Sequence, residues 1–195
     1  MMHLFNENKA VGLLSEIIAL ERGYTPTKAK MIRSAAVLHD IGKKKIDSKI
    51  LAKQGELSPQ EFETMKTHTW LGAEMLKSVT GELGEMTRLC CLMHHEKHDG
   101  SGYWNIPLQL LPEYLSFVAI ADVYTALIVE RPYKSALPPG EALEYIQNQA
   151  GTQFCPILVR DFIWLTEGDN RIPAIFSEVI ITNGNDGIET KNTSA

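Results

Sequence analysis

The sequence predicts an all-α protein, a single bundle of about six to eight helices. Apolar residues recur at helical spacing in several segments, and hydroxyl residues followed by proline mark helix starts. Only one β-branched run, Ile175 to Thr182, is typical of a short strand. The 195 residues are 44% hydrophobic, which suffices for one continuous core. We therefore predict one domain over residues 1–182 and a polar, disordered tail over residues 183–195.

The N-terminal half predicts three helices. Lys9 to Leu20 carries apolar residues at helical spacing. Thr25-Pro26 is typical of an N-cap followed by proline at the first helical position, and predicts a helix from Pro26 to about Ile41. The basic stretch after Gly42 is irregular, and Ser58-Pro59-Gln60-Glu61 then marks the start of the next helix.

The C-terminal half continues the helical pattern. Leu83 to His95 is helical by its apolar spacing, whereas Asp99 to Gly102 contains too much glycine to continue that helix and predicts a loop. Tyr114 to Val129 is apolar enough for a buried helix. Two further helices are predicted, from Glu141 to Gln149 and from Pro156 to Leu165.

Composition limits the classes of partner and the compartment. The 24 acidic and 19 basic residues give a net charge of -5, which argues against binding a nucleic-acid polymer by charge alone. A phosphate-bearing ligand would need local positive charge, which bound metal ions can supply. No apolar run is long enough to span a membrane, no secretory signal is recognisable, and the three cysteines suit a reducing compartment. We therefore expect a cytoplasmic protein.

Histidines and aspartates mark the candidate chemistry. A charged aspartate is costly to bury unless it is paired, so Asp122, within the apolar segment Ala119 to Val123, predicts a partner such as a metal ion. Two adjacent pairs of potential ligands suggest more than one ion, because neighbouring side chains on a helix point in different directions. The candidate ligands are His39, Asp40, His68, His94, His95 and Asp122.

The sequence resembles the HD-GYP group of the HD phosphohydrolase superfamily over nearly all of the chain up to about Leu165. Five ordered blocks carry the resemblance, and together they are far more specific than the dipeptide His-Asp alone. The blocks are HDIGK at 39–43, SKILAKQGELSPQEFETMKTHTWLGAEML at 48–76, HHEKHDGSGY at 94–103, AIADVYTAL at 119–127 and ERPYK at 130–134.

The resemblance implies a role for each matched residue. The six candidate ligands would hold divalent ions, iron or manganese, with Asp40 bridging. Two or three ions are implied in all, the third depending on His3 and Glu7. Lys43 would contact a substrate phosphate and, with Asp40, serve catalysis. Gly102 and Tyr103 would form the family's loop beside the site. Arg131 and Lys134 would support the ligand or that loop.

The resemblance also implies an activity. It is the hydrolysis of cyclic di-GMP to pGpG, and in some members to GMP, by attack of a hydroxide that bridges the ions. Two alternatives stay open: a catalytically weak module that binds cyclic dinucleotides or serves interaction, and a phosphohydrolase that acts on another nucleotide. A regulatory or signalling protein partner and an oligomer are also left open.

Four residues depart from the family pattern. His3 and Glu7 stand where some members carry third-metal ligands in the opposite order, and a frayed N-terminus is an equal alternative. Trp104 replaces the proline after Gly102-Tyr103, where packing of the loop is favoured over stacking on a guanine. Cys155 stands where the family usually has an aspartate, a position expected to support the fold.

Overall fold

The computed structural model describes residues 2–130, 135–169 and 171–172, and of residues 2–6 the backbone alone. This part of the chain contains eight α-helices and no strand, so the all-α prediction is confirmed. The predicted strand at 175–182 and the tail at 183–195 lie outside the described residues.

The helices follow one another through short connections. Their bounds are α1 (Met2–Glu21), α2 (Pro26–Ala36), α3 (Ser48–Leu51), α4 (Pro59–Met75), α5 (Gly81–Met93), α6 (Tyr114–Ile128), α7 (Pro139–Asn148) and α8 (Pro156–Ile163). Three short helices of other types are also present in the described part: the 3-10 helices η1 (Ile41–Lys45) and η2 (Leu108–Leu110), and the π-helix η3 (Trp164–Gly168).

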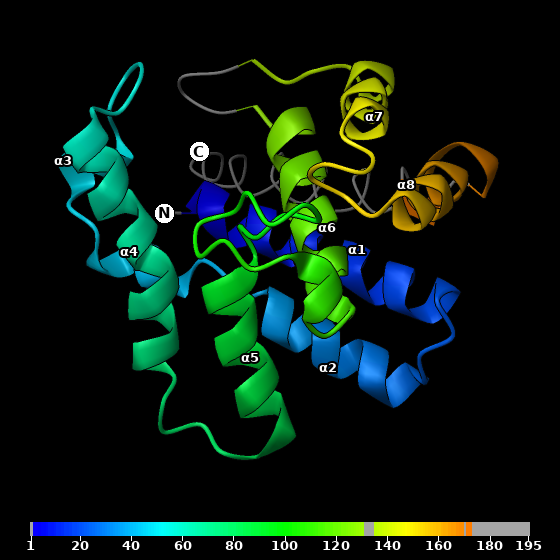
Figure 1. The fold of residues 1–195 in the computed structure, drawn as a ribbon, viewed down its shortest axis with the longest axis horizontal. Helices are drawn as coiled ribbons and strands as arrows, with labels where there is room; N and C mark the ends of the chain where they lie inside the picture. The colour runs from blue at the N-terminus through cyan, green and yellow to red at the C-terminus, as the bar shows by residue number, and fades with distance from the viewer. Residues whose placement is uncertain (1, 131–134, 170, 173–195) are drawn as a thin grey trace, which may run out of the picture.

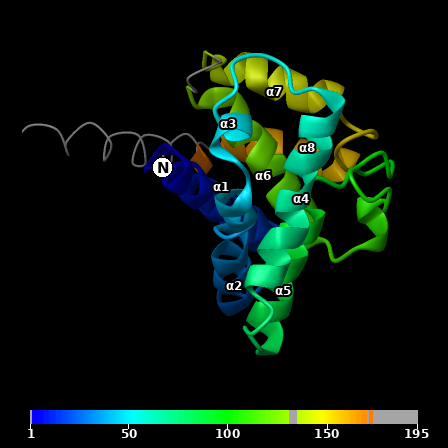
Figure 2. The same ribbon diagram turned by 90° about the vertical axis from the view of Figure 1, so that its left-hand side faces the viewer.

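Helix α6 is the centre of the bundle. It packs against α1, α5 and α7, while α1 and α2 form one hairpin and α4 and α5 another. Figure 1 shows α6 between the α4–α5 hairpin and the pair α7 and α8, and in the turned view of Figure 2 the α4–α5 hairpin faces the viewer. The largest fully buried side chains come from α1, α2, α6, α7, α8 and their connections, and include Leu14, Ile32, Phe117, Ile146 and Phe162. One continuous apolar core therefore holds the helices in place.

Local signals fix the starts of α2 and α4. The Thr25 hydroxyl accepts a hydrogen bond from the Lys28 amide, and proline occupies the first turn of α2. At α4, the Ser58 hydroxyl accepts from the Glu61 amide while the Glu61 carboxylate accepts from the Ser58 amide, a complete capping box. Both starts agree with the sequence prediction.

The predicted end of α2 is wrong. The helix ends at Ala36, and residues 37–40 form a turn that leads into η1, rather than continuing to Ile41. The reason is a contact distant in sequence: η1 packs on α4, and a Cβ atom at Gly42 would lie 1.9 Å from the His68 carbonyl oxygen. The chain must leave the helix to bring Gly42 this close to α4.

None of the described helices combines the length with the apolar run that crossing a bilayer requires.

Candidate metal centre

Four segments bring the six predicted ligands together. His39 and Asp40 lie in the turn after α2, His68 on α4, His94 and His95 at the end of α5, and Asp122 on α6. They form two overlapping groups that share His94, and within each group the potential ligand atoms all lie within 4.8 Å of one another. The groups are Asp40, His68, His94 and His95, and His39, His94 and Asp122.

The turn after α2 replaces the helical geometry that the sequence predicted for His39 and Asp40. Both side chains still reach the cluster, since His39 Nε2 lies 3.3 Å from Asp40 Oδ2 and 3.5 Å from Asp122 Oδ1. The other carboxylate oxygen of Asp40, Oδ1, lies 3.3 Å from His68 Nε2 and 3.6 Å from His94 Nε2. Asp40 therefore faces both groups, which is the position that a bridging carboxylate needs.

Backbone carbonyls orient three of the histidine rings. The Nδ1 atoms of His39, His68 and His94 lie 2.7, 2.7 and 2.9 Å from the carbonyl oxygens of Ala36, Met65 and Cys90. A carbonyl oxygen only accepts, so each Nδ1 carries the proton and donates it. In a neutral ring this tautomer leaves Nε2 free to coordinate a metal, the usual arrangement around a protein-bound ion.

The cluster consists almost entirely of acceptors. His39 Nε2 and Asp40 Oδ1 are buried and have no hydrogen-bond partner. Buried polar atoms without partners are rare and costly, and each is explained by an ion, a water or a functional role. Imidazole nitrogens and carboxylate oxygens are suitable ligands for divalent transition metals. The buried cluster is thus compatible with divalent metal binding.

Charges within the cluster shift the pKa values of its members. Burial lowers the pKa of His39, but the negative charges of Asp40 and Asp122 outweigh it and raise that pKa to about 10. Burial and the neighbouring His94 lower the pKa of His68 to about 4, and the same two causes lower that of His95. Burial opposes ionisation of Asp40, yet Lys43 and His39 hold its pKa well below the usual range. His68, His95 and Asp40 are accordingly unprotonated at neutral pH, as metal ligands must be. His39 instead carries a second proton at Nε2, which a metal ion bound there would replace.

Lys43 contacts the cluster directly. Its Nζ donates to Asp40 Oδ2 over 2.6 Å, and the Lys43 side chain is 22% exposed. The predicted contact between Lys43 and a substrate phosphate stays a prediction, but the ammonium lies where a phosphate bound at the cluster would find a cation.

The loop after α5 contacts the cluster through Tyr103. The Tyr103 ring lies 4.4 Å from the His95 ring, centroid to centroid, at an interplanar angle of 33°. Gly102 packs so closely on the preceding turn that a Cβ atom would lie 2.5 Å from Glu96 Cα. Gly102 therefore lets the loop approach closely enough for Tyr103 to stack on a predicted ligand.

Glu96 is a site residue that the sequence reasoning missed. Its carboxylate is buried and accepts hydrogen bonds from the backbone amides of Trp104 and Ile106, each over 2.7 Å. These bonds hold the loop that carries Tyr103. The only signal in the sequence is its place directly after His94-His95.

Trp104 closes the same loop against α5. Its indole N–H donates to the Leu92 carbonyl oxygen over 3.0 Å, although 47% of the residue is exposed. This contact fits the packing interpretation of Trp104.

The cysteines before His94 do not suit a zinc site. Both Cys90 and Cys91 are buried, and neither joins a ligand group among the described residues. Burial raises the pKa of both thiols, that of Cys91 to about 12, which opposes the thiolate that zinc requires. Cys91 instead donates to the Leu38 carbonyl oxygen, so both cysteines belong to the packing of α5.

Several predicted positions are not tested by these contacts. Arg131 and Lys134 lie outside the described residues, and so does the side chain of His3. Glu7 lies on α1 and is half-buried. The third-metal hypothesis and the supporting roles of Arg131 and Lys134 therefore stay predictions.

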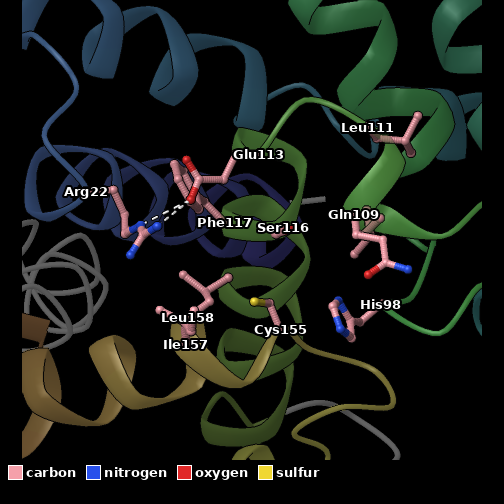
Figure 3. A pocket seen from close by; sticks show the side chains of 11 residues that line it. Arg22, His98, Gln109, Leu111, Glu113, Ser116, Phe117, Cys155, Ile157 and Leu158 are labelled. Atoms are coloured by element: carbon pink, nitrogen blue, oxygen red, sulfur yellow. Dashed lines mark hydrogen bonds and ion pairs between the residues drawn. The ribbon is translucent and has the colours of Figure 1, made fainter.

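A separate cavity of about 160 Å³ lies between the N-terminal ends of α6 and α8 and contains none of the six clustered residues. Figure 3 shows the Arg22–Glu113 ion pair and the Cys155 thiol among its lining side chains. Arg22 also pairs with Asp161, which ties α1 to α6 and α8. The polar groups at this edge of the cavity are engaged in holding helices together.

The fold and the cluster define a class of protein: an all-α bundle with a buried histidine and aspartate centre compatible with divalent metals. The model of the HD domain family matches residues 1–158. The chain belongs to the HD domain family.

Relatives within this family are cyclic-dinucleotide phosphodiesterases. A cyclic di-GMP phosphodiesterase of Thermotoga maritima is 38% identical over 165 residues, covering 84% of this chain and 45% of the relative. A 3′3′-cGAMP-specific phosphodiesterase of Vibrio cholerae is 37% identical over 150 residues, covering 76% of this chain and 29% of the relative. The chain thus spans less than half the length of these curated relatives. The resemblance to the HD-GYP group is confirmed.

A solved structure has the same fold. The HDG"Y"P protein of Bdellovibrio bacteriovorus superposes with a TM-score of 0.66 at 19% identity, covering 82% of this chain and 51% of that one.

Proposed function

We propose that this chain is a metal-dependent phosphodiesterase that hydrolyses cyclic di-GMP to pGpG, with further hydrolysis to GMP as a second step. One observation carries the proposal: six histidine and aspartate side chains from four segments converge in a buried, acceptor-rich cluster with two unpartnered ligand atoms. The relative from Thermotoga maritima, named a cyclic di-GMP phosphodiesterase, supports the choice of substrate.

The six residues would hold two divalent ions, with Asp40 between them. His94 belongs to both groups and would give its one free nitrogen to one of the two ions. Such ions, when bound, lower the pKa of water and stabilise charge on phosphoryl oxygens. Iron and manganese are the proposed metals, because imidazole and carboxylate ligands suit both. A third ion at His3 and Glu7 remains part of the proposal.

The chain's own residues would orient the phosphodiester. Lys43 would exchange part of its bond with Asp40 for a phosphate oxygen and add a fixed positive charge there. Tyr103 would keep the His95 ring in place by stacking on it, and Glu96 would keep Tyr103 there by holding the loop. Arg131 and Lys134 would contribute further contacts to the ligand or the loop.

A second candidate differs only in the nucleotide. A metal site selects the phosphate more than the base, and the Vibrio cholerae relative is named as specific for 3′3′-cGAMP. The same centre could therefore hydrolyse a mixed cyclic dinucleotide. The cytoplasmic location, the regulatory partner and the oligomer expected from the sequence stay predictions.

The test is turnover by anaerobically purified protein supplied with manganese or ferrous iron. Cyclic di-GMP and 3′3′-cGAMP are compared, with products resolved by chromatography and Asp40→Ala as the control. Formation of pGpG or GMP that disappears in the control would support the proposal. Faster hydrolysis of 3′3′-cGAMP would favour the second candidate. Binding of cyclic di-GMP without any product would instead indicate a binding module.

A further inference from the structure

A cavity of about 270 Å³ opens beside the cluster. His94 and His95 form part of its wall, so a group bound in the cavity lies next to the candidate metal centre. Small-molecule sites usually span about 300–1,000 Å³, so this cavity offers room for one nucleotide unit rather than a whole cyclic dinucleotide. The side chains that face it outside the cluster include Phe62, Lys66, Lys97, Tyr103 and Gln153.

Two aromatic rings from distant segments meet at the cavity. Phe62 on α4 and Tyr103 on the loop after α5 lie 5.8 Å apart, centroid to centroid, at an angle of 83°. One face of the Tyr103 ring already stacks on the His95 ring. Phe62 is 43% exposed, and its place in the wall leaves aromatic surface on which a base can stack. Stacking of a base on an aromatic side chain is a common mode of nucleotide recognition.

A cation lies within reach of both rings. Lys66 Nζ is 5.6 Å from the Phe62 centroid and 5.7 Å from the Tyr103 centroid. Both distances approach the ~6 Å limit of a cation–π contact, so the rings hold the ammonium weakly.

The ion pair of Lys66 also leaves it available. Lys66 Nζ lies 2.8 Å from Glu63, whose side chain is 68% exposed. A pair of this kind on an exposed helix face contributes little, because water competes for both groups. A phosphate in the cavity can therefore replace Glu63 as the partner of Lys66.

The charges of a cyclic dinucleotide require such a second cation. The ligand carries two phosphodiester groups with one negative charge each, and only one can be attacked at the metal centre at a time. The other phosphate lies one nucleotide away and loses water when it binds, so it needs a positive partner. Lys66 lines a cavity of one-nucleotide size that begins at His94 and His95.

We propose that Lys66 and Phe62 form a subsite for the nucleotide unit adjacent to the cleaved phosphodiester. Lys66 donates to the second phosphate, and Phe62 stacks on the base between the two phosphates. This inference rests on the proposed function and adds to it the two residues that distinguish a cyclic dinucleotide from a simple phosphodiester.

The test compares Lys66→Met with Lys77→Met. Lys77 offers a matched control, because it pairs with Glu74 in the same i, i+3 arrangement and does not line the cavity. Two substrates are used with metal-loaded protein, cyclic di-GMP and bis(p-nitrophenyl) phosphate, which has no second phosphate. Equilibrium binding of the bisphosphorothioate analogue of cyclic di-GMP, which resists hydrolysis, gives a readout independent of turnover.

Lys66→Met is expected to raise the KM for cyclic di-GMP and the Kd of the analogue about tenfold, since it removes one charged hydrogen bond. Hydrolysis of bis(p-nitrophenyl) phosphate should stay within about twofold, and Lys77→Met should change none of these values. Phe62→Leu keeps an apolar side chain but removes the ring. It should raise the KM for cyclic di-GMP and the Kd of the analogue, and leave hydrolysis of bis(p-nitrophenyl) phosphate unchanged.

Unchanged binding in Lys66→Met would overturn the subsite and leave the proposed function intact. Equal losses on both substrates would also overturn it, because Lys66 would then act through the metal centre or the fold. If Lys77→Met weakened binding of cyclic di-GMP as much as Lys66→Met, the loss would come from the change in net charge, and the subsite would again be overturned. A wild-type protein that cleaves bis(p-nitrophenyl) phosphate but neither binds nor hydrolyses cyclic di-GMP would overturn the proposed function itself.

Discussion

The Nε2 atoms of His68 and His94 lie 3.3 Å apart. Each ring donates its Nδ1 proton to a backbone carbonyl, so both Nε2 atoms present lone pairs toward each other and toward Asp40 Oδ1, 3.3 and 3.6 Å away. Acceptors at these distances repel unless a cation lies among them. The arrangement is stable only with a proton or a metal ion between the rings.

Metal removal should therefore destabilise the protein. A ligand at a hundred times its Kd stabilises the native state by about 2.7 kcal/mol, which corresponds to roughly 5–10 °C in Tm for a chain of this size. We expect a chelator to lower Tm by this amount and manganese to restore it, as measured by differential scanning calorimetry. His94→Ala should abolish the response, because His94 belongs to both ligand groups. A Tm that is indifferent to chelator and metal would contradict this expectation.

Gly42→Ala should destabilise the junction between η1 and α4. The added Cβ would lie 1.9 Å from the His68 carbonyl oxygen and 2.5 Å from the Gly72 amide nitrogen, both rigid backbone atoms. Overpacking of this kind costs about 1–3 kcal/mol, to be measured by urea denaturation. Gly140→Ala is the control, because a Cβ there meets nothing within 4 Å. Equal stability of the two variants would show that η1 can move away from α4 without cost.

Glu96→Gln should loosen the loop that carries Tyr103. The carboxylate accepts two amide protons, from Trp104 and Ile106, whereas an amide side chain offers one acceptor and turns a donor toward the other N–H. Leaving a buried donor unsatisfied costs about 1–3 kcal/mol. Hydrogen exchange at the Trp104 and Ile106 amides should accelerate, while Glu63→Gln on the exposed face of α4 should leave both rates unchanged. Unaltered exchange in Glu96→Gln would show that the Glu96 carboxylate does not hold the loop that carries Tyr103.

The capping box of α4 should make stability depend on acid pH. Hydrogen bonds from Lys53 and from the Ser58 amide lower the pKa of Glu61 from its usual 4.5 to about 2. A pKa lowered in the folded state means that the contribution is complete above pH 4.5 and is lost as pH falls toward 2. The stability difference between wild type and Glu61→Gln should thus shrink from pH 6 to pH 3 in urea denaturation. A constant difference would show that the Glu61 charge contributes nothing.

The sequence predicted helix boundaries correctly where contacts within a few residues determine them. The starts of α2 and α4 were predicted because Thr25 and Ser58 bond to amides within three residues of themselves. The end of α2 was mispredicted because Gly42 is held by α4, a contact that no local pattern contains. The four-residue helix α3 was missed because it is too short to show helical periodicity.

The same distinction holds for the site. The six clustered residues were found because they stand in four of the five ordered family blocks, not because their spacing alone required a cluster. Glu96 was missed because its role depends on a loop that returns to it eight and ten residues later. Phe62 and Lys66 lie within the family block at 48–76, but that pattern gives them no role. Only the packing of α4 beside the loop after α5 brings them to the cavity that His95 also lines.

The most direct test of the central claim is cyclic di-GMP turnover by metal-free protein titrated with manganese under anaerobic conditions. Two overlapping ligand groups predict little activity up to about one equivalent per chain, a steep rise toward two equivalents and a plateau at or beyond two. The product should be pGpG or GMP. Activity that is undiminished without metal, or no product at any loading, would contradict the account.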